Sequence, residues 1–169
     1  MGRRTDNAQL RSIIGELRRE IPDICLRTTL ITGFPGETQK DFAVLKDFVK
    51  EMRFDRLGVF PYSPEEGTGA AKMKGQIPSF IKNMRRNAIM KLQQEIAFEK
   101  ATEMIGKSVD VLIEGKLPED GVFIGRTYKD APNVDGMIFI NSDRELVTGD
   151  VIKARVTDSH EYDLIGEEV

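Results

Sequence analysis

The sequence predicts an α/β region followed by a small all-β domain. In residues 1–104, long stretches with helical periodicity alternate with two short β-branched runs, an order typical of parallel strands joined by helices. After Gly106 the pattern changes to five short runs of alternating apolar and polar residues, which predicts a closed or nearly closed barrel of the OB-like kind. The expected domains are therefore 1–104 and 105–169.

The composition is that of a folded globular protein. The 169 residues are 40% hydrophobic and 31% charged. No apolar run approaches the roughly 20 residues that a membrane-spanning helix needs, and the first residues show no signal peptide. The single cysteine, Cys25, excludes an internal disulfide and a multi-cysteine metal site, and the single histidine, His160, excludes a histidine cluster. We expect a cytoplasmic protein with no membrane partner.

Two helices and two strands are expected first. A helix begins after Thr5 or Asp6 and ends at Pro22, and a second helix covers 38–52 with Thr38 as its N-cap. The runs 27–32 and 56–60 predict buried parallel strands. The apolar stripes of the two helices consist of Leu10, Ile13, Ile14, Leu17 and Ile21, and of Phe42, Leu45, Phe48, Val49 and Met52.

A long helix and five strands complete the prediction. The helix covers 79–104 after a linker-like stretch at 69–77, and Gly106 is its expected C-terminal stop. Its inward face is expected to carry Met84, Ala88, Leu92 and Ile96. The five predicted strands are 109–113, 122–127, 137–140, 151–156 and 162–165.

The segment between the first strand and the second helix is a candidate binding site. The turn 33–36, Gly-Phe-Pro-Gly, ends the strand, and α/β folds bind ligands at such strand-to-helix turns, although many glycine turns bind nothing. Side chains alternate along a strand, so Arg27, Thr29 and Ile31 share one face. If that face points into the interior, the charge of Arg27 needs a partner. Arg27 is therefore a candidate ligand-binding residue.

The charge is distributed unevenly along the chain. Residues 105–169 contain 7 lysines and arginines against 14 aspartates and glutamates, a formal charge of −7, whereas residues 1–104 contain 18 against 14, a formal charge of +4. An acidic surface repels nucleic-acid phosphates and attracts a basic partner, and it also aids solubility without any partner.

Three segments occur in the order Ile31-Thr32-Gly33-Phe34-Pro35-Gly36-Glu37-Thr38, Tyr62-Ser63-Pro64-Glu65-Glu66-Gly67-Thr68 and Tyr162-Asp163-Leu164. Together they resemble the radical S-adenosylmethionine methylthiotransferases. Within that family the resemblance is to the enzymes that modify an aspartate of a ribosomal protein, and it covers essentially the whole chain. Residues 1–104 are similar to the C-terminal part of a radical-SAM (βα) barrel, and residues 105–169 are similar to a TRAM domain.

The resemblance implies a reaction and its cofactors. S-adenosylmethionine is cleaved reductively to a radical, and a methylthio group is placed on the β-carbon of an aspartate in a small-subunit ribosomal protein. The family carries two 4Fe–4S clusters, one on a CxxxCxxC motif and one on three cysteines of a further N-terminal domain. Neither set occurs in this sequence, and Cys25 cannot replace six ligands. The fragment alone is therefore expected to be inactive.

The resemblance also implies which residues contact S-adenosylmethionine. The strand and glycine turn are similar to the element beside the ribose and methionine, and residues 59–62 to the segment that packs against adenine. Thr29 stands where many such enzymes have glycine, and Arg27 is expected to pair with the carboxylate of S-adenosylmethionine or of the target aspartate. No catalytic or metal-binding residue is expected. The expected cofactor-binding residues are Arg27, Thr29, Ile31, Gly33, Gly36, Glu37, Val59, Phe60 and Tyr62.

Two alternative functions stay open at this point. One is a related tRNA methylthiotransferase of MiaB type, but the acidic charge of 105–169 favours a basic ribosomal protein over RNA as the partner of this domain. The other is a non-enzymatic adaptor that binds protein or RNA. The missing cysteines favour the adaptor if Met1 is the native start, and the incomplete barrel with an open strand edge favours an enzyme fragment.

Overall fold

The computed structural model describes residues 5–118 and 121–169. The chain divides into two compact units, Met1–Ile96 and Ala97–Val169. Within the described residues no helix is both long and apolar enough to cross a membrane.

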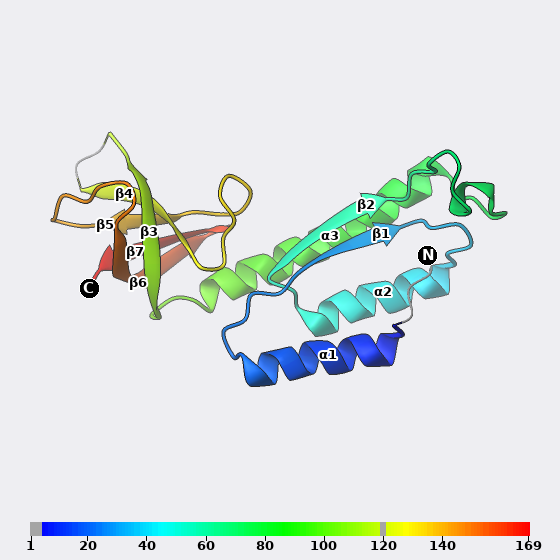
Figure 1. The fold of residues 1–169 in the computed structure, drawn as a ribbon, viewed down its shortest axis with the longest axis horizontal. Coiled ribbons are helices and arrows are strands. Elements are labelled where there is room, and N and C mark those ends of the chain that lie inside the picture. Colours follow the sequence, from blue (N-terminus) through cyan, green and yellow to red (C-terminus); the bar gives the residue numbers. More distant parts are fainter. Residues whose placement is uncertain (1–4, 119–120) are drawn as a thin grey trace. The chain divides into compact units, whose positions relative to one another are not determined.

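The first unit contains a two-stranded parallel sheet and its helices (Figure 1). The two strands pair in register from Arg27 opposite Arg56 to Thr32 opposite Pro61, so the predicted parallel pairing is confirmed. The elements in chain order are α1 (Asn7–Glu20), β1 (Arg27–Thr32), α2 (Gln39–Met52), β2 (Arg56–Pro61), the short 3-10 helix η1 (Ala70–Lys72) and α3 (Ser79–Thr102), whose last turns belong to the second unit.

Helices α1 and α2 begin where local chemistry fixes them. Asp6 caps α1 and Thr38 caps α2, and in each case the third helical residue returns a bond to the cap backbone, which completes a capping box. The Thr38 hydroxyl donates to the Asp41 carboxylate at 2.7 Å, and this bond holds the pKa of Asp41 below its ordinary value. The start of α2 directly after the glycine turn is therefore set by the sequence itself.

The sheet is buried on one face only. Leu30 of β1 and Leu57 and Val59 of β2 lie in one apolar core with side chains from all three helices. On the other face Arg27, Thr29 and Ile31 of β1 are exposed, and Phe60 of β2 is 61% exposed. Burial of alternate residues is the pattern of a sheet that helices cover on one face.

Two expectations about the helices are wrong in part. No residue of α1 is buried, and its predicted stripe is exposed at Leu10 and Ile13. Ile14 of α1 packs half-buried against the core, and Arg18 adds polar contacts by donating hydrogen bonds to the carbonyls of Met52 and Arg53 at the end of α2. In α3, Met84 is 55% exposed. Ile96 is buried and Ala88 and Leu92 pack half-buried against the core, as expected. The most buried side of the helix is displaced by one residue and consists of Lys82, Arg85, Ile89, Gln93 and Ile96.

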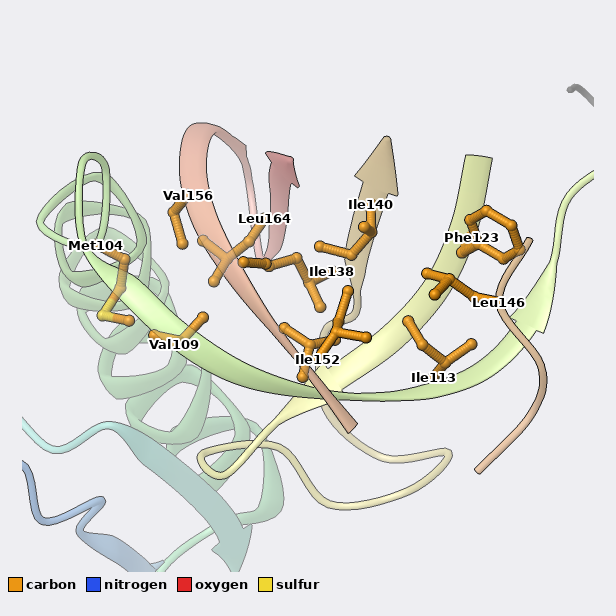
Figure 2. Close-up of a cluster of buried hydrophobic side chains, with 12 residues drawn as sticks. Met104, Val109, Ile113, Phe123, Ile138, Ile140, Leu146, Ile152, Val156 and Leu164 are labelled. Carbon is orange, nitrogen blue, oxygen red and sulfur yellow. The ribbon is translucent and has the colours of Figure 1, made fainter. Parts of the chain in front are cut away.

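The second unit contains a closed five-stranded barrel, as the sequence predicts. Its strands pair in the order β3-β4-β5-β7-β6, and all pairs are antiparallel except β5 with β7. Figure 2 shows the side chains that fill the barrel, among them Phe123, Ile138 and Ile140. The strands are β3 (Ser108–Lys116), β4 (Val122–Thr127), β5 (Ile138–Asn141), β6 (Val151–His160) and β7 (Asp163–Glu168).

Closure of the barrel requires glycine at Gly125. A Cβ atom there would lie 2.6 Å from Val111 Cγ1 and 2.7 Å from the Leu112 carbonyl oxygen, whereas a Cβ at Gly115 of β3 would meet nothing within 4 Å. The backbone of β3 cannot move aside without breaking its pairing with β4.

We predict that Gly125→Ala lowers the free energy of unfolding of the barrel by about 1–3 kcal/mol, because the added methyl group overpacks the strand pair. Gly115→Ala is the matched control and should change it by less than about 0.5 kcal/mol. Denaturant titration followed by circular dichroism measures both. Equal losses in the two variants would contradict the argument from close approach.

Candidate functional site

The turn after β1 is held by its own glutamate. Gly33 and Gly36 have φ values of +72° and +85°, which glycine adopts without strain. The Gly33 N–H donates to Glu37 Oε2 at 3.0 Å, and the Glu37 N–H donates to the Phe34 carbonyl at 2.9 Å. Glu37, an expected cofactor-binding residue, therefore uses one carboxylate oxygen to close the turn.

Two basic residues of α3 reach this turn, and the sequence reasoning missed both. Arg85 Nη1 donates to Glu37 Oε1 at 2.6 Å and to the Glu37 carbonyl oxygen at 3.1 Å. Lys82 Nζ donates to the Tyr62 carbonyl oxygen at 2.9 Å. Their spacing was the available signal, since Lys82 and Arg85 continue the buried face of Ile89 toward the start of α3.

Tyr62, at the end of β2, packs against the turn. Its N–H donates to the Thr32 carbonyl at 2.8 Å, and its ring meets the Phe34 ring edge-on at a centroid distance of 5.2 Å. Lys82 Nζ also lies 4.9 Å from the centre of the Tyr62 ring. The Tyr62 hydroxyl is buried and has no hydrogen-bond partner among the described residues. The structure thus brings Tyr62 together with the turn, as expected for a shared site.

The stretch expected to be a linker also contacts the turn. The Gly36 N–H donates to the Gly75 carbonyl at 2.9 Å, and Gly75 has a φ of +78°. The loop between β2 and α3 therefore folds back onto the end of β1 and does not act as a flexible spacer.

Some of the predicted cofactor-binding residues lie together on the exposed face of the sheet. Ile31 lies opposite Phe60 and Thr29 opposite Gly58, so a shallow apolar strip runs toward the turn. Val59 does not belong to this strip, because its side chain is buried in the core on the other face. Arg27 shares the exposed face but begins β1, which places it six residues, or about 20 Å, from Gly33.

This arrangement suits a small organic ligand. It offers an apolar strip, backbone groups of a glycine turn and the positive end of α2 at the carboxyl ends of two parallel strands. It does not suit a metal ion, because the described part of the chain contains no group of three histidine, cysteine, aspartate or glutamate side chains that could hold one.

Comparison with known proteins identifies relatives over nearly the whole chain. The TRAM domain family matches residues 105–169. The chain is 59% identical to the ribosomal protein uS12 methylthiotransferase RimO of Lachnoclostridium phytofermentans over 98% of its residues. It is 47% identical to that of Thermoanaerobacter sp. and 46% identical to that of Desulfitobacterium hafniense, over 99% and 100% of its residues. It spans 38% of the length of each relative.

We predict that Gly33→Ala destabilises the first unit more than Gly36→Ala does. Both changes place a side chain at positive φ, at a cost of about 1–2 kcal/mol. Only the Cβ at position 33 would also lie 2.4 Å from Lys82 Cγ, with the Lys82 backbone 3.3 Å away, which adds about 1–3 kcal/mol. Thermal unfolding of the two variants measures the difference, and equal melting temperatures would show that Lys82 does not pack under the turn.

Proposed function

Because the chain belongs to the RimO family of ribosomal protein uS12 methylthiotransferases, we propose that it is the C-terminal region of an enzyme that adds a methylthio group to the β-carbon of an aspartate in that ribosomal protein. The identity of 46–59% over nearly every residue carries this proposal. In it, residues 1–104 are the last part of a radical-SAM barrel, residues 105–169 are its TRAM domain, and the compartment is the cytoplasm.

The exposed face and the turn are the proposed S-adenosylmethionine site of this region. Ile31 and Phe60 supply an apolar surface on which the flat adenine ring can pack. Without a ligand, these two side chains are exposed to water. The backbone of Gly33 and Gly36 approaches the ribose and methionine, since neither residue has a side chain to hold the ligand away. Val59 contributes through its backbone alone.

Arg27 is proposed as a separate contact. A guanidinium on the exposed face binds a carboxylate in two parallel hydrogen bonds. Its place at the amino end of β1, about 20 Å along the strand from Gly33, is equally far from S-adenosylmethionine at the turn and from the target aspartate, which must lie beside that molecule, so the two carboxylates stay equal candidates for this contact.

The iron–sulfur clusters would be held elsewhere in the complete enzyme. S-adenosylmethionine bound next to a reduced cluster supplies the radical chemistry, but the only cysteine of this chain is Cys25. The residues of this region therefore bind and orient S-adenosylmethionine and do not ligate iron.

The barrel is proposed to recognise the protein substrate. At least five of the seven lysines and arginines of residues 105–169 pair with acidic residues in the described part of the chain, yet this segment keeps a formal charge of −7. The remaining acidic excess favours a basic ribosomal protein over the phosphates of tRNA.

For the first proposal we predict that, in the complete enzyme, Phe60→Ala weakens S-adenosylmethionine binding about tenfold with little change in melting temperature, because a 61% exposed side chain stabilises the fold only slightly. Val44→Ala, an exposed apolar residue of α2, is the control and should leave affinity unchanged. Calorimetry measures affinity.

Arg27→Lys should reduce turnover sharply without unfolding, and near-normal turnover would remove Arg27 from the site.

For the barrel we predict measurable binding of the chain to purified uS12 that weakens as salt rises from 50 to 200 mM, because the attraction is between exposed charges. Binding to tRNA should be much weaker at every salt concentration. Fluorescence anisotropy with each labelled partner measures both. Comparable salt-dependent binding to tRNA would reverse the assignment in favour of a tRNA methylthiotransferase.

A further inference from the structure

The start of α3 is connected to both strand ends of the proposed site by buried charged side chains. We infer that Arg85 and Lys82 are positioning residues, which set the geometry of the glycine turn and of Tyr62 for S-adenosylmethionine binding without touching the ligand themselves. This inference rests on the proposed function.

Arg85 acts on the turn through a continuous series of hydrogen bonds. Its side chain is 6% exposed and that of Glu37 is 12% exposed, and the two are joined at 2.6 Å. One Glu37 oxygen accepts from Arg85 and the other accepts from the Gly33 N–H. The guanidinium also lies 5.4 Å from the centre of the Phe42 ring, which fixes it from the side of α2. A change at Arg85 is therefore transmitted to the backbone of Gly33.

Lys82 acts on the second strand end from the same helix. Its ammonium donates to the Tyr62 carbonyl, its backbone carbonyl accepts from the Thr32 hydroxyl at 3.2 Å, and its stem lies under Gly33. Lys82 and Arg85 are three residues apart on one face of α3. The helix therefore holds the ends of β1 and β2 at a fixed separation.

The energetics favour a positioning role over a purely stabilising one. Transferring two charged groups from water into the protein interior costs nearly as much free energy as their mutual attraction provides. Apolar side chains of similar volume therefore often stabilise a fold equally well. An apolar residue at position 85 would pack on Phe42 but would leave the Glu37 carboxylate without the partner that orients it toward Gly33. Only a hydrogen-bonded pair fixes the direction of that carboxylate.

The test uses the complete enzyme with four variants of the Arg85–Glu37 pair: Arg85→Met, Arg85→Lys, Glu37→Gln and the double change Arg85→Met with Glu37→Gln. Two quantities are measured, the affinity for S-adenosylmethionine and the amide hydrogen exchange of residues 33–37. Arg126→Met is the matched control, because it breaks the 2.7 Å pair with Glu114 in the barrel by the same substitution. Lys82→Met tests the second strand end.

We expect Arg85→Met to weaken S-adenosylmethionine binding by roughly ten- to a hundredfold and to speed exchange at residues 33–37, as small misplacements of binding groups do. Arg85→Lys should restore part of the affinity. The double change should cost no more than Arg85→Met alone, because both act through one link. Lys82→Met should weaken binding in the same direction, and Arg126→Met should change neither quantity.

Two other outcomes separate the inference from the proposed function. If the unaltered enzyme binds S-adenosylmethionine and Arg85→Met binds it equally well, the positioning role is wrong and the proposed function stands. If the unaltered enzyme does not bind S-adenosylmethionine, the proposed function is wrong and the positioning role is lost with it. A melting temperature lowered in Arg85→Met with unchanged affinity and exchange would mean a structural role only.

Discussion

The parallel pair β1–β2 is covered on one face only, and the rest of the first unit follows from this constraint. Parallel strands are normally covered on both faces. Here α2 and α3 bury Leu30, Leu57 and Val59, whereas the face of Ile31 and Phe60 stays exposed. Because side chains alternate, residues next to each other in sequence are assigned to opposite environments. This is why Val59 is a core residue while Phe60, one position later, is available to a ligand.

The buried face of α3 changes from apolar to charged along its length, and the change follows what lies opposite. Where the helix packs in the apolar core it presents Ile89 and Ile96, because it meets apolar side chains there. Beside the strand ends it meets turns, where carbonyl groups have no partner in a β ladder and need a donor. Lys82 and Arg85 supply those donors on long side chains. The charges are buried here because the backbone requires hydrogen bonds at this place.

Local patterns predicted most of the fold, and long-range contacts account for what they missed. The caps Asp6 and Thr38 and the five alternating strands are properties of short segments, and the structure confirms them. The predicted inward face of α3 was wrong at Met84, because a search for apolar periodicity does not detect a buried stripe that begins with lysine and arginine. The Arg85–Glu37 pair joins residues 48 positions apart and no segment contains both. The turn was therefore predictable from sequence. The spacing of Lys82 and Arg85 could have placed them on the buried face of α3, but could not have identified Glu37 as the partner of Arg85.

The charged side chains on the surface of the barrel contribute little to its stability. Its core is apolar and closed, so exposed ion pairs such as Lys153–Asp110 and Arg126–Glu114 contribute little to folding, typically below about 1 kcal/mol each. These pairs neutralise one another at short range, but they do not remove the net charge that an approaching molecule meets. The fold itself does not require an excess of acidic residues. An acidic surface repels the phosphates of RNA and attracts a basic protein, and this is the physical basis of the proposed preference for a protein partner.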